Sequence, residues 1–197
     1  MIDGKVYHFG ACGLANGLAI LADEETRSYW DHITGECFLG PLKGHKLDTW
    51  PIQLTTAEAA LAECPKAELS LSYYRSAGAF FLSKVMGDML HGKGFVPPFF
   101  RTTMHAEIDD RLPKLENGLG VIVGKEARYY PMRQIPQEGI EVDWDGRFLV
   151  IRKGKLDRIP VARWKDSKEK PMQLLARWYG FSFTYPHCKV WKPEDKD

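Results

Sequence analysis

The sequence predicts an α+β, β-rich single domain with a mainly antiparallel sheet or partly closed barrel and about three short helices. Its 197 residues are 44% hydrophobic and 27% charged, as in ordinary globular domains. Short apolar runs bounded by turn residues follow one another, which is typical of antiparallel strands. Strands and helices do not alternate, which excludes doubly wound nucleotide-binding folds and eight-fold α/β barrels. The predicted domain covers 1–191, followed by a polar tail at 192–197.

The first quarter of the chain is predicted to form an antiparallel meander. Its apolar or aromatic runs are Val6–Phe9, Leu18–Ala22, Ser28–Trp30 and Cys37–Gly40. The sequence Thr55-Thr56-Ala57-Glu58 then matches a capping box with Thr55 as the N-cap, so we expect a short helix that ends before Pro65. The alternation in Ala67–Ser72 indicates a half-buried strand.

The remaining elements follow from periodicity and turn residues. Apolar residues every fourth position predict a helix over Ala77–Leu90, and two prolines make Phe95–Phe100 an apolar loop. The dipeptide Asp145-Gly146 predicts a two-residue hairpin turn. The other predicted strands are Gly120–Val123, Ala127–Met132, Val142–Trp144, Arg147–Ile151 and Arg158–Trp164. A last helix is expected over Pro171–Tyr179.

Charge and hydropathy exclude several classes of partner. Lys and Arg total 27 against 26 for Asp and Glu, so no net field attracts nucleic acid or an anionic membrane. No apolar stretch reaches the roughly 20 residues that span a bilayer. The first residues lack the charged start and apolar run of a signal peptide, so the sequence as given predicts a cytoplasmic protein. If a signal peptide was removed before Met1, the prediction changes to an exported protein. The four cysteines form no C-x-x-C pair, which favours reduced thiols.

The leading hypothesis is a small-ligand or metal site between the Cys12 turn and the loop Asp31–Glu36. Cys12 would be a thiolate ligand or nucleophile, His32 a base or second ligand, and Glu36 their carboxylate partner. His8 would complete a site for a thiophilic metal such as copper or zinc, and Trp30 and Asp31 would contact a ligand. The alternatives are a small buried thiol at Cys12 and an Asp-initiated turn with exposed side chains.

A second group of candidates surrounds Arg111. His105, Glu107, Asp109 and Asp110 offer ligands for a hard cation, and Arg111 offers an anion anchor. The alternative is a salt bridge from Arg111 to a neighbouring acid that holds a loop in place.

The rival function is a non-catalytic interaction or homodimerisation module. Adjacent residues of a strand point to opposite faces, so one member of each aromatic pair should be exposed and available to a partner. The pairs are Tyr73 with Tyr74, Phe99 with Phe100, and Tyr129 with Tyr130.

The sequence also resembles a bacterial family, domain of unknown function 3179. The resemblance rests on Asp3-Gly4-Lys5-Val6, Phe9-Gly10-Ala11-Cys12-Gly13, Asp23-x-x-Thr26-x-Ser28-x-Trp30, Thr34-Gly35-Glu36, Gly40-Pro41-Leu42-x-Gly44, Asp109-x-Arg111-Leu112-Pro113 and Ala127-x-Tyr129-Tyr130-Pro131. It implies one compact domain and no particular reaction. Members carry an N-terminal Cys-Pro-x-x-Cys section that is missing here, so its metal or redox role does not transfer. Cys12 and His32 stand where relatives commonly have serine and glutamine.

Overall fold

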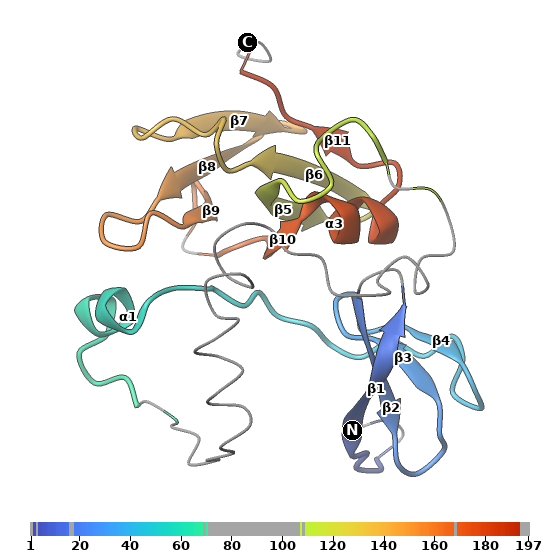
Figure 1. Ribbon diagram of the computed structural model, residues 1–197. Coiled ribbons are helices and arrows are strands. Elements are labelled where there is room, and N and C mark those ends of the chain that lie inside the picture. Colours follow the sequence, from blue (N-terminus) through green and yellow to red (C-terminus); the bar gives the residue numbers. More distant parts are fainter. Residues whose placement is uncertain are drawn as a thin grey trace, which may run out of the picture.

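The computed structural model describes residues 2, 4–15, 18–68, 70, 107, 109–167 and 169–193. Figure 1 shows the elements that these residues form. The strands are β1 (Phe9–Ala15), β2 (Leu18–Asp23), β3 (Tyr29–Asp31), β4 (Cys37–Leu39), β5 (Asn117–Val123), β6 (Glu126–Pro131), β7 (Ile140–Trp144), β8 (Arg147–Lys153), β9 (Pro160–Trp164), β10 (Met172–Arg177) and β11 (Lys189–Val190). The helices are α1 (Ala57–Glu63) and α3 (Trp178–Thr184).

The predicted N-terminal meander is confirmed. Its order is β1-β2-β3-β4, with every neighbouring pair antiparallel. The first strand shares only Phe9 with the predicted run Val6–Phe9 and continues to Ala15. The turn expected at Cys12 is therefore wrong: Cys12 lies within β1, at the point where the register with β2 shifts. A small cluster of Ile2, Trp30 and Cys37 forms the core of this sheet.

The C-terminal half forms three layers (Figure 1). A four-stranded sheet, β10-β5-β6-β11, packs one face against the three-stranded sheet β7-β8-β9 and the other against α3. All its pairs are antiparallel except β11 with β6. Within the described residues, neither sheet closes on itself. The partly closed barrel, which was one of the two predicted architectures, therefore does not form.

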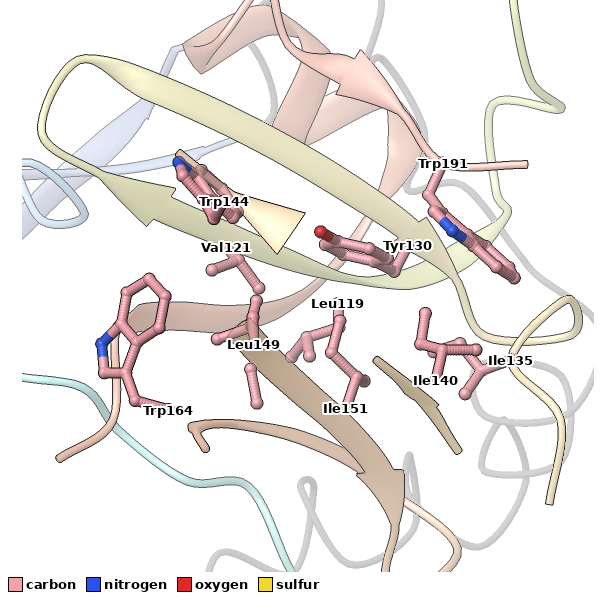
Figure 2. Packing of buried hydrophobic residues seen from close by; sticks show 11 residues of the cluster. Leu119, Val121, Tyr130, Ile135, Ile140, Trp144, Leu149, Ile151, Trp164 and Trp191 are labelled. Atoms are coloured by element: carbon pink, nitrogen blue, oxygen red, sulfur yellow. The ribbon is translucent and has the colours of Figure 1, made fainter. Parts of the chain in front are cut away.

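Tryptophan and aliphatic side chains fill the space between the two sheets, as Figure 2 shows. Leu119 and Val121 of β5 meet Leu149 and Ile151 of β8, and all four side chains are at most 2% exposed. Tyr130 of β6 adds its ring to the same layer. Burying a side chain of this size contributes about 1.5–3 kcal/mol, so this layer stabilises the packing of the two sheets.

The hairpin predicted at Asp145-Gly146 is confirmed. Asp145 has a φ of 53° and Gly146 a φ of 84°, and two positive angles in succession are what a type I′ turn requires. The side chain of Asp143 accepts a hydrogen bond from the Gly146 N–H at 2.8 Å, which closes the turn. The predicted strands on either side become β7 and β8.

The helix predicted over Pro171–Tyr179 is wrong. Met172–Arg177 is strand β10, paired along its whole length with β5, and the helix α3 begins only at Trp178. The Gln173 side chain is buried and exchanges two hydrogen bonds with the backbone of Ala162, at 2.8 and 3.0 Å. Pairing with residues far along the chain therefore overrides the helical spacing.

Two details of the helices also differ from prediction. Thr56, one residue later than expected, caps α1 by accepting from the Ala59 N–H, while Thr55 instead donates to Asp157 at 2.5 Å. The described residues contain two helices against about three predicted, and the expected helix Ala77–Leu90 lies outside them, as does the loop Phe95–Phe100. Within the expected strand Ala67–Ser72, the described positions 67, 68 and 70 are not in a strand. Neither described helix is long and apolar enough to cross a membrane.

Candidate functional site

A buried carboxylate organises the meander. Asp23 is 0% exposed, and one of its oxygens accepts from the N–H and hydroxyl of Thr26 at 2.6 and 2.7 Å. The other accepts from the Ser28 N–H at 3.1 Å and the Trp30 indole N–H at 2.9 Å. Burial raises the pKa of Asp23, but these hydrogen bonds outweigh it and leave the pKa below its ordinary value. The motif Asp23-x-x-Thr26-x-Ser28-x-Trp30 is therefore a folding motif.

The loop Asp31–Glu36 is held by its own backbone. An Asp31 oxygen accepts from the N–H groups of Ile33 and Thr34 at 2.7 and 3.2 Å, as in an Asp-initiated turn. Gly35 has a φ of 72°, and an added Cβ would lie 2.8 Å from the Leu47 carbonyl oxygen. The exposed Glu36 carboxylate faces Lys46 at 3.4 Å. The loop therefore has the geometry of an Asp-initiated turn, which was the predicted alternative to a ligand site.

Cys12 and His32 lie on opposite sides of β2. Both side chains are exposed: the Cys12 thiol donates to the Ile20 carbonyl oxygen at 3.4 Å, and His32 Nδ1 is 2.7 Å from the Ala19 carbonyl oxygen. Cys12 lies in β1 and His32 directly follows β3, and two strand spacings, about 10 Å, separate these two strands. Chemistry that uses both residues stays a prediction, and it requires a ligand that reaches across β2.

His8 pairs with an acid rather than with Cys12. Its Nδ1 is 2.7 Å from a Glu25 oxygen, and its backbone N–H donates to the other oxygen at 3.0 Å. The hydrogen bond and charge of Glu25 raise the pKa of His8, and the same contact lowers the pKa of Glu25. Among the described residues, no three His, Cys, Asp or Glu side chains gather where they could hold a metal ion.

We expect the His8–Glu25 pair to be strongest in weakly acidic solution. Because the folded pKa of His8 is raised, its contribution is present below pH about 6.5 and is lost as the pH rises through the raised value. Because the pKa of Glu25 is lowered, its contribution is lost as the pH falls through that lowered value. NMR titration should show the pKa of His8 falling clearly in Glu25→Gln and only slightly in Glu24→Gln. Equal effects of the two substitutions would contradict the pairing.

Arg111 holds two distant segments together. Its Nε and Nη2 donate to the two oxygens of Asp109 at 3.0 and 2.7 Å, and its Nη1 donates to the Cys188 carbonyl oxygen at 2.8 Å. Its guanidinium also lies 5.2 Å from the centre of the buried Trp178 ring. Asp109 keeps a lowered pKa through its hydrogen bonds from Arg111. Arg111 therefore forms the predicted salt bridge to a neighbouring acid, and it holds the segment around Asp109 against the segment around Cys188. Of the neighbouring candidates, Glu107 and Asp110 are exposed and His105 lies outside the described residues.

The expected exposure of one member of each aromatic pair is wrong for Tyr129 and Tyr130. Both are 0% exposed, because α3 covers one face of β6 and the β7-β8-β9 sheet covers the other. Tyr129 donates to the Glu116 and Ala176 carbonyl oxygens at 2.8 Å. The pairs Tyr73–Tyr74 and Phe99–Phe100 lie outside the described residues.

Exposed apolar side chains also gather on the meander. Each residue from Phe9 to Leu14 is exposed, with Leu14 at 56%. Of the twelve exposed large apolar side chains in the described part, six belong to the meander, namely Val6, Phe9, Leu14, Tyr29, Phe38 and Leu39. The register places Gly10, Ala22, Tyr29 and Leu39 in one row across its four strands. An apolar face and an apolar edge therefore adjoin there, which is typical of an interaction surface.

Comparison with known proteins identifies the family. Residues 1–178 match the family described as "Protein of unknown function (DUF3179)". The chain belongs to this family. No curated protein and no solved structure matches it. Several of the residues that carry the resemblance to DUF3179 make hydrogen bonds that hold the fold together. They are Asp23, Thr26, Ser28, Trp30, Asp109 and Arg111. The sequence contains a signal for this edge, because Phe9–Ala15 has neither charge nor proline.

Proposed function

We propose that this domain is a non-catalytic interaction module that pairs with a second copy of itself along the edge of β1. The observation that carries this proposal is the uncharged strand Phe9–Ala15 at the end of its sheet, which is exposed from Phe9 to Leu14. In the part of the chain that the structure describes, no strand lies beside β1 on the side away from β2. Such an edge presents a row of backbone donors and acceptors to a partner strand.

The composition of β1 favours a second copy as the partner. Natural edge strands are commonly protected by lysine, proline or charge, and Phe9–Ala15 has none of these. Two antiparallel copies related by a two-fold axis would bring no like charges together. The small side chains of Gly10, Ala11 and Gly13 allow close approach. Cys12 is the middle residue of the seven, so the two Cys12 residues would lie near the axis, which gives the exposed thiol a place in the interface.

We expect Leu14→Lys to convert the dimer into a monomer. Leu14 is 56% exposed in β1, so the charge is tolerated in the monomer but is buried in the interface. Leu156→Lys is the matched control, because Leu156 is 54% exposed on the β8–β9 connection. Sedimentation velocity should give a mass near twice 22.5 kDa for the unmodified chain and Leu156→Lys, and 22.5 kDa for Leu14→Lys. A dimer that survives Leu14→Lys would exclude this interface.

A further inference from the structure

A cavity of about 290 Å³ lies in the C-terminal half, away from the meander. Its walls come from the start of β5, the turn after β6, the end of β8 and the β8–β9 connection, which supply Asn117, Arg133, Lys153 and Arg158 in that order. Met132 gives one side an apolar surface. None of these residues contributes to the β1 edge or to the loop Asp31–Glu36.

The cavity is strongly cationic for a chain of almost neutral charge. Arg133, Lys153 and Arg158 line it against one carboxylate, Glu116. Elsewhere on the surface, exposed arginines such as Arg147 and Arg163 pair with acids at 3.0–3.1 Å. By contrast, no carboxylate of the described residues is within ion-pairing distance of the three cavity cations. Their positive charge is thus available to a bound anion.

The backbone presents two of the cations in defined positions. Lys153 Nζ donates to the Ile135 carbonyl oxygen at 2.6 Å, which fixes the ammonium group at the cavity wall. Arg158 has a φ of 56°, a left-handed conformation that residues other than glycine rarely adopt. Its N–H donates to the Gly154 carbonyl oxygen at 3.1 Å, which closes the turn. Glycine or asparagine would suit this angle better than arginine, so the guanidinium is placed here at the expense of backbone strain.

We propose that this cavity binds a small organic oxyanion that carries two negative charges. Two guanidinium groups match planar carboxylate or phosphate oxygens, and Lys153 adds a point charge. The volume lies at the lower end of small-molecule sites, so it suits an anion of a few carbon atoms. The apolar side of Met132 would contact the carbon skeleton, and the amide of Asn117 would bind its polar substituents.

Isothermal titration of the full chain with succinate, glycerol 3-phosphate and acetate tests this proposal. We expect saturable binding of one or both dianions, and the preferred one identifies a dicarboxylate or a phosphate ester. Acetate, which has one charge, should bind at least tenfold more weakly. A chain that binds neither dianion at millimolar concentration would overturn the proposal.

The chain offers a matched control for the arginine. Arg158→Gly removes the guanidinium and relieves the left-handed backbone, and Arg27→Gly does the same at a φ of 60° on the β2–β3 turn. We expect Arg158→Gly to weaken binding at least tenfold and Arg27→Gly to leave it unchanged. Arg158→Asn, which also tolerates this conformation, should behave like Arg158→Gly. Equal affinities in all of these variants would contradict the site. Leu14→Lys should bind normally, which separates this site from the β1 interface.

Discussion

Asp23→Ala should lower the free energy of unfolding by about 4 kcal/mol. The substitution leaves four donors without their acceptor, and each buried donor left unsatisfied costs about 1–3 kcal/mol. The loss is largest at Trp30, because this residue is 0% exposed and its indole N–H donates to Asp23. Urea unfolding followed by circular dichroism measures the change.

Two further measurements separate this network from a general effect of lost charge. Glu24→Ala, at the exposed neighbouring position, should change stability by less than about 0.5 kcal/mol. Because the folded pKa of Asp23 is lowered, its contribution is present above pH about 3.9 and is lost as the pH falls through the lowered value. The stability difference between the unmodified chain and Asp23→Ala should therefore shrink in strong acid. A difference that stays constant down to pH 2 would show that the carboxylate charge is not the cause.

Gly120→Val should destabilise the C-terminal half by about 3 kcal/mol. Gly120 lies in β5 beneath α3, and an added Cβ would overlap the ring of Phe181. That ring cannot move aside easily, because Tyr129 and Tyr185 pack against it with centroids 5.1 and 4.9 Å away. Overpacking of a filled core costs about 1–3 kcal/mol for small insertions, and valine adds three carbon atoms.

Combining Gly120→Val with Phe181→Leu in a double mutant tests why Gly120→Val lowers the stability. If the overlap with the ring destabilises Gly120→Val, the smaller leucine should recover part of the stability, so the two changes should not be additive. Gly13→Ala in the monomeric Leu14→Lys background is the control, since its added Cβ meets nothing within 4 Å of its own chain. Additive effects of Gly120→Val and Phe181→Leu would place the cause elsewhere.

The sequence predicted those elements whose signals are local. Asp145-Gly146 specifies its turn through two consecutive residues that tolerate positive φ, and the structure has that turn. The strands on either side of Gly124 are likewise bounded by their own turn residues. In contrast, β10 has helical spacing in its sequence, and it is a strand because it pairs with β5, whose residues lie 50 to 60 positions earlier. Register with a distant segment cannot be deduced from spacing within the segment.

Functional candidates were harder to predict than strands. Within the charged clusters of the sequence, Asp31 closes its own turn and Asp109 pairs with Arg111. The cations of the cavity are spread over positions 133, 153 and 158, and no motif connects them. Tyr129 and Tyr130 are adjacent in a strand, so their side chains are predicted to point to opposite faces of the sheet. That pattern does not predict that other elements cover both faces and bury both side chains.

Hydrogen exchange in β1 tests most directly whether this strand pairs with a second copy. In a single copy, the β1 amides that point away from β2 face solvent and should exchange rapidly. Pairing with a second copy protects them, and the protection should increase with protein concentration because association follows mass action. We predict strong protection of these amides over Phe9–Leu14 at high concentration, lost on dilution and in Leu14→Lys. Rapid exchange that is the same at every concentration would contradict the proposed interface.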